Sequence, residues 1–183
     1  MHLHSRKWLG WGLPVFAFGL VIALAGCNKV VSTNSTTPPP PPSTDPDQEA
    51  DALLATVRTG LAASMEKAAA AGIAKEAIVL DPGYGFGKRF EENYALLAQQ
   101  AELLALGRPL LIGVSRKSFL GRTLAPLHGG NDAPVDARET AIVAALVAAT
   151  LHGASVVRVH AVRQGVEAAR IADAVLAADY ERD

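Results

Sequence analysis

The hydrophobic residues between positions 46 and 180 follow two patterns that alternate along the chain. In some stretches they recur every three or four residues, as on the buried face of an amphipathic helix. In others they form short uninterrupted runs, as in parallel strands that are covered on both faces. The pattern predicts helices at about 46–71, 91–106, 136–151 and 164–178, and strands at 78–80, 110–114 and 155–159. Helices and strands that alternate in this way predict an α/β fold with a parallel sheet.

Residue types near the helix ends refine these boundaries. Asp45 followed by Pro46 is typical of a helix start. Asp136, with Glu139 three residues later, resembles a capping box that opens the third helix after a polar loop predicted at 121–135. Two sets of apolar residues are expected to face the core: Leu53, Leu54, Val57, Leu61 and Met65 in the first helix, and Ala168, Ile171, Val175 and Ala178 in the last.

The first strand leads into a glycine-rich loop at 81–88 that begins with Asp81. Glycines allow a close approach of the backbone to a ligand. The spacing excludes two common phosphate-binding loops. A Walker loop needs glycine and Ser or Thr where this chain has Pro82 and Arg89, and the dinucleotide fingerprint needs glycine in place of Lys88. An ordinary strand-to-helix turn remains the alternative interpretation of this loop.

The other two strands also end in polar residues. Ser115-Arg116-Lys117-Ser118 follows the second strand, and Arg158 and His160 close the third. Because the carboxyl ends of parallel strands meet at one edge of a sheet, these side chains are expected to lie near Asp81, as in barrel or doubly wound enzymes. Barrel enzymes often bind phosphate on the loops after their last two strands, so Arg158 and His160 would be candidates for an anion site if the fold is a barrel. A solvated pair at a strand end is the alternative.

The first 45 residues differ in composition from the rest. A charged start is followed by an apolar run at 13–25 that ends in Leu24-Ala25-Gly26-Cys27, which resembles the lipobox of bacterial lipoproteins. Residues 1–27 are therefore predicted to be a lipoprotein signal peptide, with Cys27 as the lipid-modified membrane anchor; an uncleaved membrane helix is the alternative. Residues 28–45 are rich in Pro, Ser and Thr and are predicted to be a disordered tether to a folded part at 46–183.

Composition limits the function further. Of the 183 residues, 50% are hydrophobic, which is enough for a core, and only 19% are charged. The formal net charge of −1 provides no electrostatic basis for binding nucleic acid. The single cysteine excludes an internal disulfide.

Three strand-end motifs thus follow one another: Asp81-Pro82-Gly83-x-Gly85-Phe86-Gly87-Lys88, Gly113-Val114-Ser115-Arg116-Lys117-Ser118-Phe119 and Arg158-Val159-His160. Over about residues 47–180 they resemble the last three strands of dihydropteroate synthase, of the pterin-binding barrel family. The resemblance implies a partial TIM (β/α)8 barrel made of these strands and their helices. The corrinoid methyltransferases share this barrel, but the Ser-Arg-Lys-Ser-Phe run is similar to that of the synthases.

The resemblance also implies a transferase that joins 4-aminobenzoate to 6-hydroxymethyl-7,8-dihydropterin diphosphate and releases diphosphate, with Mg²⁺ as cofactor. Asp81 and Lys117 are the implied catalytic residues. The implied contacts are Asp81, Gly113 and Lys117 for the pterin, Phe86, Lys117 and Ser118 for 4-aminobenzoate, and Arg158 and His160 for the diphosphate. Cations at that last position fit the chemistry, because negative charge grows on the leaving diphosphate.

The chain also departs from the family pattern. Ala161 stands where the family more often has Asp after the histidine, and no match is expected for the family's first five strands, which carry its magnesium-binding asparagine and its closing loops. Two open sheet edges are therefore expected, with an amino-terminal half or a homo-oligomer as partner. The leader predicts a membrane-anchored protein, whereas the family predicts a cytoplasmic one. A non-catalytic lipid-anchored module and the product of a rearranged gene are the alternatives.

Overall fold

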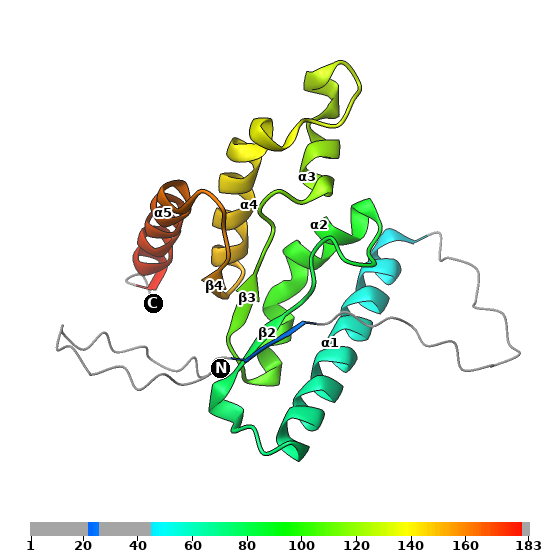
Figure 1. Ribbon diagram of the computed structural model, residues 1–183, viewed down its shortest axis with the longest axis vertical. Coiled ribbons are helices and arrows are strands. Elements are labelled where there is room, and N and C mark those ends of the chain that lie inside the picture. The colour runs from blue at the N-terminus through cyan, green and yellow to red at the C-terminus, as the bar shows by residue number, and fades with distance from the viewer. Residues whose placement is uncertain (1–21, 26–44, 181–183) are drawn as a thin grey trace, which may run out of the picture.

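A parallel sheet forms the centre of the computed structural model, which describes residues 22–25 and 45–180. The sheet has four strands in the order β1-β2-β3-β4, and every neighbouring pair is parallel (Figure 1). The strands are β1 (Ile22–Ala25), β2 (Ile78–Asp81), β3 (Leu110–Ile112) and β4 (Ala154–Val157). The predicted α/β class and the three predicted strands are confirmed, although β3 and β4 end two residues earlier than expected.

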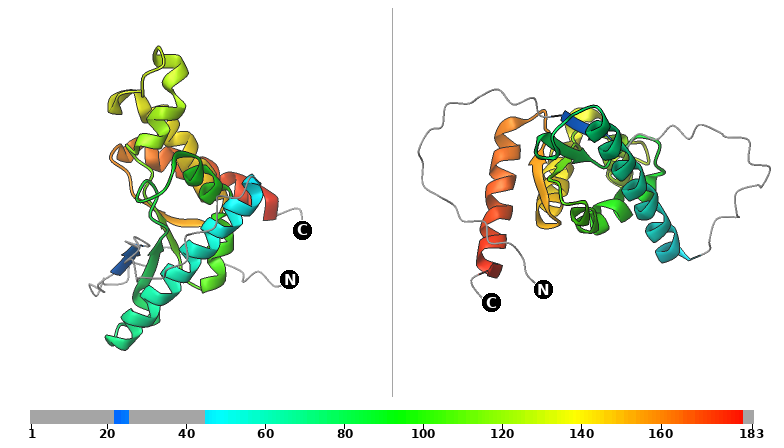
Figure 2. Two further views of the ribbon diagram at one scale, coloured as in Figure 1. Left: turned by 90° about the vertical axis from the view of Figure 1, so that its right-hand side faces the viewer. Right: turned by 90° about the horizontal axis from the view of Figure 1, so that it is seen from below.

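Helices connect the strands and cover the sheet. They are α1 (Pro46–Ala70), α2 (Phe90–Gln99), α3 (Ser118–Thr123), α4 (Glu139–Leu151) and α5 (Val162–Tyr180). Short 3₁₀ helices lie at Lys75–Ala77, Gln100–Leu106, Ala125–His128 and Val135–Arg138. Seen from below, α1 and α5 lie on opposite sides with the sheet and α4 between them (Figure 2).

Helix α1 forms as the sequence predicts. The Asp45 carboxylate accepts a hydrogen bond from the Asp47 amide at 3.0 Å and so caps the first turn. On the inner face of α1, Leu54, Val57 and Leu61 are buried against the core. The remaining core comes mainly from β2, β3, α2 and α4, including Leu80, Leu110 and Ile112 in the strands and Leu96, Ile142 and Leu146 in the helices.

The predicted helix at 91–106 is wrong in its second half. The α-helix ends at Gln99, and a 3₁₀ helix continues to Leu106 before Gly107 in a left-handed conformation. The change coincides with Gln100, whose buried side chain accepts from the Tyr84 hydroxyl at 2.6 Å and donates to the Ala149 carbonyl at 2.8 Å. The spacing of apolar residues, on which the predicted helix rested, gives no sign that the polar side chain of Gln100 is buried and hydrogen-bonded.

The loop predicted at 121–135 and the capping box after it are also wrong. Helix α3 starts at Ser118 and occupies part of this stretch, because Phe119 and Leu120 are buried and hold it against the core. At the start of α4 the residue in the N-cap position is Arg138, and no side chain caps the helix there. Arg138 is itself buried.

The inner face predicted for the last helix is correct only at Ala168. Ala172 is also buried, whereas Ile171 and Val175 are 63% and 51% exposed and Ala178 is exposed. Small residues allow α5 to approach its neighbours closely, and a Cβ on Gly165 would come within 2.9 Å of Val159. The large apolar residues of α5 therefore lie on its outer face.

Strand β1 comes from the stretch predicted to be a signal peptide. Ile22 pairs with Ile78 and Ala25 pairs with Asp81, so β1 occupies the edge of β2 that was expected to be open. Beyond β4, no further strand lies among the described residues. Cys27, and the rest of the predicted leader and tether apart from β1 and Asp45, lie outside the described residues. In the part of the chain that the structure describes, no helix is long and apolar enough to cross a membrane.

Candidate active site

The three sequence motifs lie at one edge of the sheet, because β2, β3 and β4 are parallel and each motif follows a carboxyl end (Figure 1). Leu80 of β2 pairs with Leu110 of β3. The Arg158 amide, just past β4, donates to the Ile112 carbonyl at 2.9 Å. The parallel sheet therefore places the three groups of polar residues on neighbouring strand ends, as the sequence predicts.

Asp81 shapes the loop that it begins. One of its carboxylate oxygens accepts a hydrogen bond from the Gly83 amide at 2.8 Å. The other accepts none from the described residues, and Asp81 is half-buried. Gly83, Gly85 and Gly87 all have positive φ, at 76°, 70° and 63°, which explains why the loop needs glycine at these positions. The turn thus presents one carboxylate oxygen that can accept hydrogen bonds from a ligand.

Tyr84 anchors the same loop in the core. Its side chain is 1% exposed, and its hydroxyl donates to the Gln100 side chain at 2.6 Å. Burial raises the pKa of the Tyr84 phenol far above its usual range, and the negative charge of Asp81 raises it further. The tyrosine is therefore a neutral structural anchor in the folded protein.

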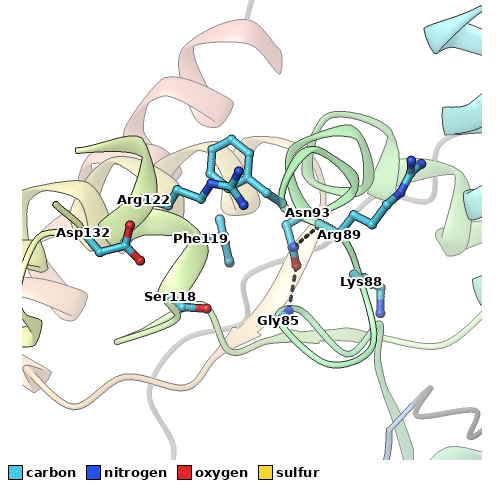
Figure 3. A pocket seen from close by; sticks show the side chains of 9 residues that line it. Gly85, Lys88, Arg89, Asn93, Ser118, Phe119, Arg122 and Asp132 are labelled. Carbon is cyan, nitrogen blue, oxygen red and sulfur yellow. Dashed lines mark hydrogen bonds between the residues drawn. The ribbon is translucent and has the colours of Figure 1, made fainter. Parts of the chain in front are cut away.

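Two further side chains brace the loop, and the sequence analysis assigned no role to either. Asn93 of α2 accepts from the Gly85 amide at 2.7 Å and donates to the Arg89 carbonyl at 2.7 Å (Figure 3). The Lys88 ammonium donates to the carbonyls of Pro82 at 3.0 Å and Gly83 at 2.8 Å. These bonds close the loop on itself, and a polar residue in an amphipathic helix gives no signal of such a contact.

Lys117 and Phe86, which come from different loops, meet at the site. The Lys117 nitrogen lies 3.3 Å from the centroid of the Phe86 ring, in a cation–π contact. The stem of Lys117 crosses Gly85 so closely that a Cβ there would lie 2.8 Å from Lys117 Cδ. Phe86 is still 54% exposed, so its ring retains a surface for another partner.

The residues at the end of β4 contact the loop after β3. Ser115 Oγ lies 2.9 Å from His160 Nδ1 and accepts from the His160 amide at 3.3 Å. The contact engages one ring nitrogen of His160 and leaves the Nε2 side for other partners. The Arg158 guanidinium lies over Gly113, where a Cβ would come within 2.9 Å of it. Arg158 and His160 are both exposed.

A cavity of about 360 Å³ opens between the glycine loop and α3 (Figure 3). Ser118 is the one predicted site residue that lines it, and Asp81, Phe86 and Lys117 do not. Its lining consists of Gly85, Lys88, Arg89, Phe90, Asn93, Ser118, Phe119, Arg122 and Asp132. Three of these residues are cationic and one is acidic, so the cavity is suited to a small anionic group.

The cations of this cavity differ in their own contacts. Arg89 forms ion pairs with Glu49 and Glu92, each at 2.9 Å, and the pKa of Arg89 is raised by its hydrogen bond to Glu92 first and to Glu49 second. The Arg122 guanidinium lies 4.8 Å from the centroid of the Phe90 ring. No described carboxylate forms an ion pair with Arg122, which therefore keeps its charge for a ligand.

Comparison with known proteins identifies the family. The family described as "Pterin binding enzyme" matches residues 17–160. The chain belongs to this family. It is 47% identical over 124 residues to the dihydropteroate synthase of Mycobacterium leprae (strain TN), and 45% identical over 108 residues to that of Escherichia coli (strain K12).

Solved structures of the pterin-binding family have the same fold. Yersinia pestis dihydropteroate synthase in complex with a pterine-sulfa conjugate matches with a TM-score of 0.68 and 34% identity, over 87% of this chain and 53% of that one. The Coxiella burnetii enzyme in complex with pteroic acid matches with a TM-score of 0.65 and 33% identity, over 82% and 49%. The resemblance carried by the three motifs is therefore confirmed for the family and for an α/β fold with a parallel sheet that matches these structures.

The match covers part of each relative. It includes 68% of this chain and 43% of the Mycobacterium leprae protein, and 59% and 36% for the Escherichia coli protein. The chain thus spans less than half the length of these curated relatives. The family match also starts at residue 17, earlier than the resemblance at 47–180 predicted, and so includes β1.

The Mg²⁺ that the family implies has no set of ligands in this part of the chain. Residues 22–25 and 45–180 contain no group of three or more His, Cys, Asp or Glu residues that could hold a metal ion. Asp81, the acidic residue at the strand ends, uses one carboxylate oxygen for its own turn. The described residues do not by themselves fit a magnesium site.

Proposed function

We propose that this chain forms the part of a dihydropteroate synthase that carries the last three barrel strands, and that its three strand ends bind the two substrates and the diphosphate. The observation that carries the proposal is the contact of Lys117 with Phe86, which joins the loops after β2 and β3 into one surface. Identity of 45–47% to dihydropteroate synthases supports the same chemistry.

The pterin ring is assigned to Asp81, Gly113 and Lys117. The carboxylate oxygen of Asp81 that has no partner among the described residues can accept from the adjacent N–H donors of a pterin, and the ammonium of Lys117 can donate to a ring acceptor. Gly113 follows β3 directly, and the space left by its missing side chain holds the Arg158 guanidinium, so a pterin at the Gly113 backbone would lie beside Arg158. Asp81 and Lys117 are accordingly the residues proposed to orient the electrophile.

The 4-aminobenzoate is assigned to Phe86, Lys117 and Ser118. The exposed part of the Phe86 ring offers a face or edge for aromatic packing. Ser118 lies at the start of α3 and lines the cavity that also contains Arg122. A carboxylate directed into this cavity therefore meets a hydroxyl and a guanidinium that forms no ion pair within the described part of the chain.

The diphosphate is assigned to Arg158 and His160. In the proposed reaction, the amine nitrogen of 4-aminobenzoate bonds to the pterin methylene carbon as the carbon–oxygen bond to diphosphate breaks. The amine then loses a proton to water, and diphosphate leaves with the bonding electrons. Negative charge grows on the departing oxygens, and Arg158 and His160 would stabilise it more in the transition state than in the ground state.

Calorimetry on the full chain tests the assignment. We expect the chain to bind pterin diphosphate, and the Lys117→Ala variant to lose most of this binding while its unfolding transition is unchanged. Turnover is measured as diphosphate release with both substrates and Mg²⁺, with and without the amino-terminal half of a related synthase. Equal binding by the wild type and by Lys117→Ala would overturn the assigned site.

The sheet edge at β4 is proposed to take up further barrel strands. Val156 of β4 is 41% exposed, and Val162 and Val166 of α5 are 65% and 50% exposed. An open edge beside exposed apolar residues favours a partner. We infer that the amino-terminal half of a synthase barrel covers it. A chain that is dimeric by light scattering and does not bind such a half would instead indicate a homo-oligomer.

The lipoprotein leader is a separate proposal that rests on the charged start, the apolar run and Leu24 to Cys27. Cleavage before Cys27 would remove residues 22–25, so a lipidated chain would lack β1. One molecule therefore cannot have both a lipidated Cys27 and β1. The Cys27→Ser variant should lose lipid labelling and membrane fractionation. If both persist, Cys27 is not the anchor; if the wild type is soluble and uncleaved, the cytoplasmic location applies.

A further inference from the structure

Arg138 is a buried arginine with an unusual set of partners. Its side chain is 9% exposed, at the junction between the 3₁₀ helix Val135–Arg138 and α4. Nε donates to the Ala133 carbonyl at 2.8 Å, and Nη1 donates to the carbonyls of Arg116 at 3.1 Å and Lys117 at 3.4 Å. No carboxylate lies within ion-pair distance of Arg138 in the described part of the chain. Main-chain carbonyls therefore offset its buried charge.

Helix α3 is shaped to accept this guanidinium. A Cβ on Gly121 would lie 2.5 Å from Nε and 2.6 Å from Cζ of Arg138, so only glycine leaves room for it. The Gly121 carbonyl also accepts from the Ala133 amide at 3.0 Å. The loop after β3, the loop before α4 and the backbone of α3 thus converge on one side chain.

The loop that Arg138 holds has a conformation that needs support. Arg116 is the one non-glycine residue with positive φ in the described ranges, at 64°, and such a residue is disfavoured unless its surroundings fix it. The Arg116 carbonyl is one of the groups that Arg138 contacts. Its neighbour is Lys117, whose amide donates to the Val114 carbonyl at 3.1 Å and whose ammonium lies against Phe86.

We propose that Arg138 is a positioning residue: by clamping the carbonyls of Arg116 and Lys117, it fixes the strained loop after β3 and so sets where the Lys117 ammonium lies. The proposal rests on the substrate role assigned to Lys117 above. A guanidinium suits this task because Nε and Nη1 are separate donor atoms held in one rigid plane and each reaches a different loop, whereas an ammonium offers all of its donors from a single atom.

Arg108 provides a matched control. It too donates to main-chain carbonyls, from Nε to Ile78 at 3.1 Å and from Nη2 to Glu76 at 3.0 Å. Ile78 begins β2, so these contacts lie at the opposite end of the sheet from the site. Arg108→Met therefore removes the same kind of clamp without touching the loop of Lys117.

Hydrogen exchange by mass spectrometry on the full chain tests the clamp without any ligand. We expect Arg138→Met to speed exchange in peptides that cover residues 114–121 by about tenfold or more, since hydrogen bonds from a charged donor are lost. Arg108→Met should leave these peptides unchanged. Arg138→Lys should resemble Arg138→Met. Wild-type exchange rates in either Arg138 variant would overturn the proposal.

If Arg138→Met does not fold, Gly121→Ala takes its place. The added methyl group meets the guanidinium and displaces it, while alanine is well accepted in a helix. The same local increase in exchange is expected, and normal exchange at residues 114–121 in Gly121→Ala would overturn the proposal.

A binding measurement separates positioning from a purely structural role. Arg138→Met should weaken the affinity for 4-aminobenzoate about tenfold or more, and Arg108→Met should not. Faster exchange at 114–121 with unchanged affinity would show that the clamp is structural and would overturn the link to Lys117. If the wild type binds no 4-aminobenzoate, the proposed function fails, and the exchange data still decide whether Arg138 holds the loop.

Discussion

The site has two sides that differ in how firmly the fold holds them. On the side of β2 and β3, the strand residues Ile78, Leu80, Leu110 and Ile112 are at most 1% exposed, and the loops that follow are braced by buried side chains of Asn93 and Arg138. On the side of β4, Val156 is 41% exposed, and Arg158 and His160 are exposed, with Ser115 as the side chain that contacts the His160 ring. The side that is held more firmly is therefore the one to which the pterin and the 4-aminobenzoate are assigned.

This difference follows from how the last helix packs. Helix α5 turns Ala168 and Ala172 inward and leaves Ile171 and Val175 outside, so it adds little apolar area to the core beneath β4. A small buried apolar area implies a lower local stability. The side of β4, which is proposed to bind the diphosphate, is therefore expected to be more mobile than the side of β2 and β3, which is proposed to bind the two ring substrates.

The largest contrast is expected in global stability. Leu80 is 0% exposed, so Leu80→Ala should lower the free energy of unfolding by about 2–5 kcal/mol. Ile171, which is 63% exposed on α5, should change it by about 0.5 kcal/mol or less when replaced by Ala. Urea denaturation of the full chain, followed by circular dichroism, measures both. Similar losses in the two variants would mean that the two sides do not differ in packing.

The second contrast concerns Tyr84, the core anchor of the β2 loop. Tyr84→Phe leaves the Gln100 side-chain oxygen without its donor and should cost about 1–3 kcal/mol. Because the pKa of Tyr84 is raised in the folded protein, its neutral form contributes stability fully below the ordinary tyrosine pKa of about 10.

That contribution is lost as the pH rises above this value. Wild-type stability should therefore fall above about pH 10 more steeply than that of Tyr84→Phe. The measurement is the urea midpoint of both proteins between neutral pH and about pH 11. If the urea midpoints of the wild type and of Tyr84→Phe change with pH in parallel, the Tyr84 phenol is not held in its neutral form by burial.

The third contrast tests the side of β4. Arg158→Ala should weaken the binding of diphosphate to the full chain by about tenfold, because a charged donor is lost. Arg170→Ala is the control, since Arg170 is exposed on α5 and away from the strand ends. Calorimetry at low and high salt should show that the difference in diphosphate affinity between the two variants becomes smaller at high salt, because salt screens the exposed charge of Arg158. Equal affinities of the two variants would remove Arg158 from the anion site.

The smallest effects are expected for two serines of one motif. Ser115→Ala removes the contact to His160 and should weaken diphosphate binding by roughly two- to fivefold, with 4-aminobenzoate binding unchanged. Ser118→Ala should weaken the binding of 4-aminobenzoate and leave that of diphosphate unchanged, because Ser118 lines the cavity beside the glycine loop. If either variant loses affinity for both ligands, the two sides of the site do not bind their ligands independently.

The sequence by itself determined the features that depend on local pattern. The spacing of apolar residues and the Asp45 cap were enough to predict α1, and the short apolar runs were enough to predict β2, β3 and β4. The parallel order then brought Asp81, Lys117 and His160 to one edge, because strand direction alone fixes where a carboxyl end lies.

Only the tertiary structure decided features whose partners lie far along the chain. Gln100 ends an α-helix while bonded to Ala149, and Asn93, Ser115 and Arg138 brace loops through contacts that no periodicity indicates. The inner face of α5 is another such feature, because the helix lies so close to its neighbours that Ala172 is buried and Ile171 is not. Strand β1 is a third, since it pairs with β2 across a long separation in sequence. A local pattern reports the polarity of a residue, whereas these outcomes depend on which distant groups it meets.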